Sequence, residues 1–100
     1  MEKTTNVPVR FRFNLQVLSL KGMAFDDMVE SVYLDGEDGE FELLAYHHPL
    51  VAALPKGEVK IAGHDPIPII VGIINFRENR CRIIAQIDPK FKKYQETWDF

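Results

Sequence analysis

The side chains most able to bind ions or take part in a reaction lie in one short stretch, DGEDGE at residues 35–40, just before an apolar segment. Such a concentration of carboxylates suggests a cation site, a solvated hairpin turn or an acidic contact surface for a partner. A calcium loop carries acids at alternate positions and ends in a bidentate Glu at the twelfth position, and this stretch does not supply that series. Its negative charge repels phosphate, so the glycines do not form a nucleotide cradle. The stretch alone does not decide between a turn and a contact surface.

The histidines are the other candidates for metal or acid–base chemistry. His47 and His48 are adjacent, so on a strand their side chains point to opposite faces and cannot share an ion unless the backbone turns there. His64 lies in the turn-like run Gly63–Pro66. No serine or cysteine has the neighbours of an activated nucleophile, and no carboxylate pair is framed by apolar sequence. The sequence therefore predicts no catalytic residue, no metal site and no cofactor.

The composition is typical of one small globular domain, with 100 residues of which 46% are hydrophobic and 27% charged. The net charge of −3 argues against nucleic acid binding. Acids outweigh the local basic clusters, which contain Arg10, Arg12, Arg77, Arg80 and Arg82. The single cysteine, Cys81, excludes an internal disulfide, and its strand-like context predicts an unreactive thiol that is either buried or on an edge strand.

Neither a membrane span nor a secretory signal is expected. The longest apolar run, Ile67–Ile74, is far shorter than the about 20 residues that cross a bilayer. The amino terminus lacks a basic region followed by an apolar core. We therefore expect membrane contact only through a partner.

Short apolar runs separated by turn signals extend to residue 87. Val9–Val17 alternates strictly between apolar and polar residues, which predicts a half-buried antiparallel strand, and the phase slips at Leu18–Leu20 as at a bulge. Further strands are expected at Phe41–Leu43, Leu50–Leu54, Val59–Ile61, Ile69–Phe76 and Cys81–Ile87. Residues 25–34 fit both a helical stripe and a strand. The pattern predicts an all-β fold, a two-sheet antiparallel β-sandwich or flattened barrel, over residues 1–87.

Residues 88–100 differ in character from the rest. Asp88-Pro89 is typical of an N-cap followed by proline at the first helical position. Phe91, Tyr94 and Trp98 then fall on one helical face. A helix this short is marginal alone in water, so we expect a short helix or tail that docks on the sandwich through these aromatic side chains.

Residues 35–61, DGEDGEFELLAYHHPLVAALPKGEVKI, resemble the amino-terminal β-sandwich domain of the epsilon subunit of F-type ATP synthases, in the delta/epsilon family. That family carries a pattern close to G-x-x-G-E-F-G-x-L-P-G-H-A-P-L, then an apolar run and P-G-x-V-x-I. The matching positions are Gly36, Gly39, Glu40, Phe41, Leu44, His47, Pro49, Leu50, Gly57, Val59 and Ile61. The flanking segments resemble the family's opening strands and closing hairpin, so the likeness covers residues 13–87 and favours strands at residues 25–34.

The chain also departs from the family pattern. Glu42, Ala45, Tyr46 and His48 replace family residues, which predicts a different path of the loop at residues 42–48. The family usually continues into a two-helix carboxy-terminal hairpin, whereas only residues 88–100 follow here. Its ATP-binding motif I-D-x-x-R-A is represented only by Ile87-Asp88. The resemblance therefore implies a subunit without the hairpin, which neither binds ATP nor inhibits its hydrolysis.

The resemblance implies a non-catalytic subunit in the central stalk, or rotor, of an F-type proton- or sodium-translocating ATP synthase. In this family the sandwich docks the gamma subunit onto the membrane c-ring and couples rotation to ATP synthesis. The implied location is peripheral, on the cytoplasmic face of the inner (plasma) membrane. The alternative function is a free-standing epsilon-like β-sandwich module that binds proteins outside a synthase.

The resemblance also assigns two groups of docking residues. Glu40 matches the family's ring-facing glutamate, and Glu37 and Asp38 would assist it. The segment near the gamma subunit corresponds to His47, Pro49 and Leu50. The alternatives are that the acids only solvate a turn and that the histidine is a structural residue of its loop.

Overall fold

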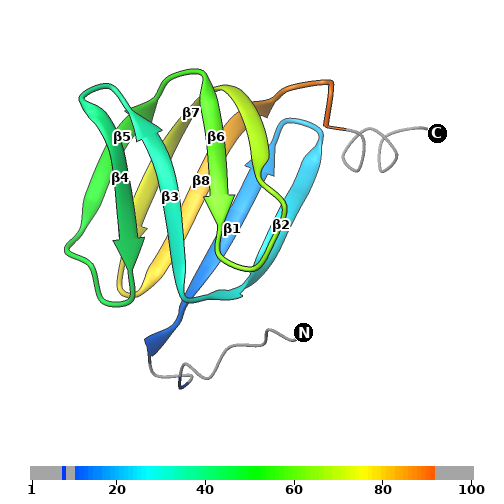
Figure 1. Cartoon of the computed structure of the whole chain (residues 1–100). Helices are drawn as coiled ribbons and strands as arrows, with labels where there is room; N and C mark the ends of the chain where they lie inside the picture. The colour runs from blue at the N-terminus through cyan, green and yellow to red at the C-terminus, as the bar shows by residue number, and fades with distance from the viewer. Residues whose placement is uncertain (1–7, 9–10, 92–100) are drawn as a thin grey trace.

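The computed structural model of the chain describes Pro8 and residues 11–91. These residues form eight strands and no helix (Figure 1). The strands are β1 (Phe13–Ser19), β2 (Gly22–Val29), β3 (Ser31–Gly36), β4 (Gly39–Leu44), β5 (Leu50–Leu54), β6 (Gly57–Ile61), β7 (Ile67–Arg77) and β8 (Arg80–Ile87).

Strand β7 joins two layers of one hydrogen-bonded array. The strand order is β2-β1-β8-β7-β6-β3-β4, and β5 also pairs with β7. The first residues of β7, Ile67–Ile69, pair with β6, whereas Gly72–Phe76 pair with β5 on one side and β8 on the other. The register shift between Ile69 and Val71 marks the corner at which the strand changes layer. One layer therefore holds β2, β1, β8, the later part of β7 and β5, and the other holds β6, β3 and β4 (Figure 1).

The predicted all-β sandwich is confirmed, with one difference in pairing. Strands β1 and β8 are parallel, whereas the other strand pairs of the described residues are antiparallel. The two strands are far apart in the sequence, and no short hairpin dictates how they meet. A parallel contact of this kind leaves no local signal in the sequence.

The core lies between the layers and follows strand alternation. In β8 the inward side chains from Cys81 to Ile87 are buried and the intervening ones are exposed. Phe13 is fully buried and meets Phe76 edge-on, with ring centroids 5.3 Å apart. The described residues contain no buried polar or charged residue. Burial also raises the pKa of the Cys81 thiol from 9.0 to about 12, so of the two predicted settings, buried or on an edge strand, the structure shows the buried one.

The amino-terminal strands differ in detail from the alternation pattern. The predicted strand from Val9 was wrong at Phe11, where the chain turns: the Phe11 N–H donates to the Pro8 carbonyl at 2.9 Å, and Phe11 is 51% exposed. The predicted bulge is confirmed by a register shift between Val17 and Leu18. Residues 25–34 form strands, in β2 and β3 with Glu30 between them, because β2 pairs with β1 and β3 pairs with both β4 and β6.

The start of the tail is described as far as Phe91. The Lys90 N–H donates to the Asp88 carboxylate at 2.9 Å, and the Phe91 N–H donates to the Asp88 carbonyl at 3.0 Å, so a turn begins at Asp88. Phe91 is partly buried against the core. The predicted helix, with Tyr94 and Trp98, lies outside the described residues.

Candidate functional site

The acidic turn joins β3 to β4 at one end of the sandwich. Gly36 and Gly39 are paired, and the exposed Glu37 and Asp38 form the turn between them. Gly39 has φ +119°, a region that L side chains rarely adopt, and a Cβ on Gly36 would lie 2.9 Å from the Phe41 ring. The glycines therefore allow a tight hairpin, and the turn displays its two carboxylates to solvent.

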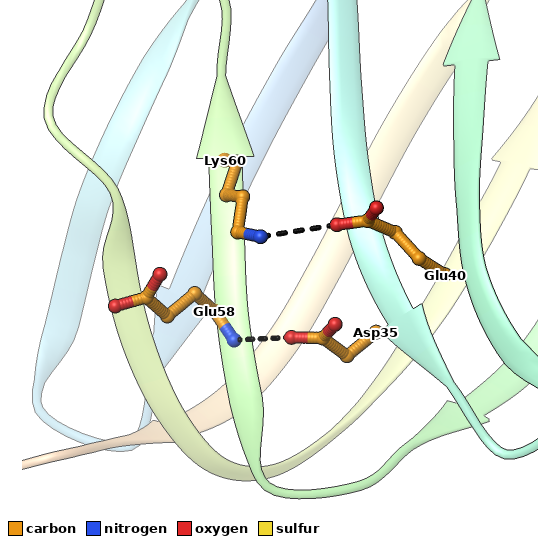
Figure 2. A network of polar contacts seen from close by, with 4 residues as sticks. All are labelled: Asp35, Glu40, Glu58 and Lys60. Carbon is orange, nitrogen blue, oxygen red and sulfur yellow. Dashed lines mark hydrogen bonds and ion pairs between the residues drawn. The ribbon is translucent and has the colours of Figure 1, made fainter.

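Glu40 forms an ion pair with Lys60, a residue that was not among the predicted site residues. Lys60 Nζ of β6 lies 3.0 Å from Glu40 Oε2 of β4, reaching across β3 (Figure 2). The hydrogen bond to Glu40 and its charge raise the pKa of Lys60. Both side chains are about half exposed, at 48% and 46%, so the pair contributes little to stability. Its effect is to orient the Glu40 carboxylate.

Asp35 ties the acidic turn to the neighbouring turn between β5 and β6. Its carboxylate accepts a hydrogen bond of 3.0 Å from the Glu58 N–H (Figure 2). A Cβ on Gly57 would lie 2.8 Å from the Asp35 Cβ, so only glycine lets the two turns approach this closely. The two turns at this end therefore form one unit.

The outer face of the β6-β3-β4 layer is predominantly acidic. Tyr33 stands between Lys60 and Glu42 in register, and the Glu42 charge together with a hydrogen bond to Glu42 raises the pKa of Tyr33. Asp35 and Glu40 point to the same side (Figure 2). Lys60 neutralises only part of this charge, and the face remains electronegative.

The loop at residues 45–49 lies at the opposite end of the sandwich (Figure 1). The His47 ring packs edge-on against the buried Phe76, with centroids 5.7 Å apart. His47 Nδ1 lies 2.7 Å from the His48 carbonyl oxygen. Because a carbonyl oxygen can only accept, the Nδ1–H group is the donor of this hydrogen bond. Pro49 is exposed, and Leu50 is partly buried against the core. His47 thus has the contacts of a structural residue, yet it is exposed, as are the other loop residues from Tyr46 to Pro49.

Asn79, which was not among the predicted site residues, holds this loop in place. It lies in the two-residue turn between β7 and β8 at φ 60°. Its Oδ1 accepts the Tyr46 N–H at 2.7 Å, and its Nδ2 donates to the Arg12 carbonyl at 2.8 Å. An asparagine in a hairpin turn of this length was the available signal, but its long-range partners are visible only in the fold.

The two groups of predicted docking residues are therefore separate. The structure brings Glu37, Asp38 and Glu40 together at one end, and places His47, Pro49 and Leu50 at the other (Figure 1). Within residues 11–91 no cluster of His, Cys, Asp or Glu side chains is close enough to hold a metal ion. The described part of the chain also has no helix long and apolar enough to cross a membrane.

Fold and surface define the class of protein: a β-sandwich domain that carries a group of carboxylates at one end and a packed histidine loop at the other. Residues 12–87 match the family model described as ATP synthase, Delta/Epsilon chain, beta-sandwich domain. The chain belongs to this family, and the family prediction made from the sequence is confirmed.

Similar proteins agree with this assignment. The ATP synthase epsilon chain of Campylobacter curvus is 33% identical over 78 residues, which are 74% of this chain and 60% of the relative. That of a Bradyrhizobium species (strain BTAi1) is 32% identical over 88 residues, covering 85% and 65%. The chain thus spans less than two thirds of the length of these relatives.

Two solved assemblies contain a chain of the same fold. One is the central stalk and c-ring of the Tetrahymena thermophila mitochondrial ATP synthase, with a TM-score of 0.65, 11% identity, and coverage of 73% of this chain and 62% of that one. The other is the Euglena gracilis mitochondrial ATP synthase, with a TM-score of 0.65, 18% identity, and coverage of 96% and 64%. At these identities the likeness establishes the fold.

Proposed function

We propose that this chain is a non-catalytic subunit of the central stalk of an F-type ATP synthase, where it docks the gamma subunit onto the c-ring and helps to couple rotation to ATP synthesis. The observation that carries the proposal is the presence of two separate surface groups, at opposite ends of a sandwich of the delta/epsilon family. A part that transmits torque needs a contact at each end and a stiff body between them.

The body of the domain suits this mechanical role. Strand β7 runs through both layers, so the backbone hydrogen bonds connect one end of the array to the other. The core is apolar throughout its described residues. Closely packed interiors resist gradual deformation, so force applied at one end reaches the other with little internal shear.

The acidic turn is the proposed contact with the c-ring. Glu37 and Asp38 project freely from the turn, and Lys60 fixes the direction of the Glu40 carboxylate. Complementary charge at an interface sets the register of docking and suppresses wrong orientations more than it adds affinity. We propose that Glu40 gives direction to the contact and that Glu37 and Asp38 steer the approach.

The loop with His47, Pro49 and Leu50 is the proposed contact with the gamma subunit. Asn79 bonds its neighbour Tyr46, and the His47 ring rests on Phe76, so the loop is fixed before docking. A loop that is already ordered loses less conformational entropy on binding. Contact with the membrane is then indirect, at the cytoplasmic face, and no nucleotide is required.

The experiment compares the variant Glu37→Gln/Glu40→Gln with a charge-matched control, Asp27→Asn/Asp65→Asn, in the assembled synthase. We expect the first to weaken association with the ring about 2- to 30-fold, the range for two partly exposed charge pairs, and to lose this effect at high salt. Its thermal midpoint should change little. Equal association of the two variants would contradict the acidic contact, and absence of stalk and ring subunits from the purified complex would favour a free-standing binding module.

A further inference from the structure

A cleft of about 420 Å³ lies on the outer face of the other layer, close to the turn between β7 and β8. Its lining includes three arginines, Arg77, Arg80 and Arg82, and one acid, Glu78. We call it the arginine cleft. The chain as a whole has a net charge of −3. The guanidinium groups therefore give this cleft a local charge opposite in sign to the net charge of the molecule.

Strand register explains how the arginines meet. Arg80 of β8 is flanked by Arg77 of β7 and Asn14 of β1, and Arg82 is flanked by Asn75 and Gln16. The intervening Cys81 is buried, so Arg80 and Arg82 project to the same outer side. Alternate residues of a strand are about 6.6 Å apart along its axis. The two guanidinium groups therefore form a ladder with the repeat of an extended chain.

The local acids do not neutralise this ladder. The structure shows no ion pair to Arg80 or Arg82 within residues 11–91. Arg77 is 3.8 Å from Glu78, and both side chains are largely exposed, at 69% and 79%, so this pair is weak. Arg82 Nε donates instead to the Gln16 amide oxygen at 3.2 Å, which fixes the guanidinium without consuming its charge.

The carboxylate of Asp26, on the strand beyond β1, is already occupied. Asp26 of β2 accepts from the Asn14 amide at 3.2 Å and from the Gln16 amide at 3.4 Å. These amides stand between Asp26 and the arginines. The two arginines of β8 are consequently available to external carboxylates, which guanidinium groups bind in bidentate geometry.

The next row of the same face is apolar. Ile84 follows Arg82 on the outer side of β8 and is flanked in register by Ile73 and Leu18. Ile84 and Ile73 are 50% and 49% exposed. A small anion would contact only the exposed arginines, where water screens the attraction, whereas an extended peptide can contact both rows. The face thus favours a protein segment over a free anion.

We propose that the arginine cleft docks an extended acidic segment of a partner protein, with carboxylates at alternate positions followed by an apolar side chain. The order of the ligand side chains mirrors Arg80, Arg82 and Ile84 along β8. This interaction goes beyond the contacts of the acidic turn and the His47 loop.

The test is an NMR titration of the full chain with the peptide acetyl-Thr-Glu-Thr-Glu-Thr-Leu-Thr-amide, at low ionic strength and at about 0.15 M salt. We expect the backbone amide signals of residues 75–84 to shift, and the affinity to fall with added salt. The variant Arg80→Gln/Arg82→Gln should weaken binding about tenfold or more, because two charge-assisted contacts are lost. The control Lys21→Gln/Lys56→Gln removes the same charge elsewhere and should stay within about twofold of the unchanged chain.

Three results would overturn the proposal. The first is equal binding by the arginine variant and its lysine control, or no shift at residues 75–84. The second is inorganic phosphate binding at the cleft as tightly as the peptide, which would make this a site for small anions. The third is sedimentation that shows self-association abolished by Arg80→Gln/Arg82→Gln, which would assign the cleft to a second copy of the chain. None of these three experiments contains another synthase subunit. Failure of the cleft proposal therefore does not contradict the proposed function in the central stalk.

Discussion

Replacing Asn79 with Ala removes the side chain that joins three segments at the histidine end of the sandwich. Two side-chain hydrogen bonds are lost, from the Tyr46 N–H and to the Arg12 carbonyl. Each such bond contributes about 1 kcal/mol net, and the change also places Ala at φ 60°, which Asn tolerates better. We therefore expect Asn79→Ala to lower the free energy of unfolding by about 2–3 kcal/mol.

The adjacent turn residue provides the control. Glu78 has φ 52°, close to that of Asn79, and its recorded contact is the 3.8 Å pair with Arg77. Glu78→Ala therefore shares the backbone constraint but removes no structural bridge, and its effect should stay within about 0.5 kcal/mol. Urea unfolding followed by circular dichroism measures both values.

Hydrogen exchange gives a local measure of the same bridge. The Tyr46 amide should exchange much faster in Asn79→Ala, while the amides of Ile83 and Ile74, in the buried strands, change only in proportion to global stability. Equal destabilisation by Asn79→Ala and Glu78→Ala, or unchanged exchange at Tyr46, would refute the claim that Asn79 positions the His47 loop.

Three further changes test the core and the turns. Phe13→Ala should cost about 3–5 kcal/mol in urea unfolding because Phe13 is fully buried against Phe76, whereas Phe11→Ala, at a 51% exposed residue, should cost less than about 1 kcal/mol; the reverse order would contradict the observed strand phase. Gly57→Ala should lower the thermal midpoint because the new Cβ falls 2.8 Å from the Asp35 Cβ, and adding Asp35→Gly should recover part of the loss; no change on Gly57→Ala would contradict the close approach of the two turns. Because burial raises the pKa of the Cys81 thiol from 9.0 to about 12, its contribution to stability is complete below pH 9 and is lost as the pH rises toward 12. Over that window the unfolding free energy should fall more steeply than in Cys81→Ala, by up to about 1.4 kcal/mol per pH unit, and parallel curves would contradict the burial of the thiol.

The sequence predicted those features of the fold that depend on local periodicity. The apolar run from Cys81 to Ile87 identified a strand, although its buried face is visible only in the structure, and the slip after Val17 identified the bulge. Alternation failed at Phe11, where a turn overrides an apolar pattern that continues toward the amino terminus. Local pattern did not distinguish helix from strand at residues 25–34, since the pairing of β2 and β3 decides it.

The candidate docking residues stay a prediction from family motifs, and the sequence carried no information on their geometry. Family motifs located Glu40 and His47, yet they gave no hint that Lys60 pairs with Glu40 or that the two docking groups lie at opposite ends. Such contacts join strands that are distant in sequence, and they arise from the order of strands in the sheets. The arginine ladder has the same origin, because β1 and β7 supply the neighbours of Arg80 and Arg82.

Site-specific cross-linking in native membranes would show which subunit lies against each end of the sandwich. Asp38→Cys and His48→Cys place a reactive thiol at each end of the sandwich, while the chain's own Cys81 is buried and remains inert. We expect Asp38→Cys to cross-link to a c-ring subunit and His48→Cys to cross-link to the gamma subunit. Cross-linking of both positions to one partner, or of neither position to these two subunits, would contradict a stalk subunit clamped between them.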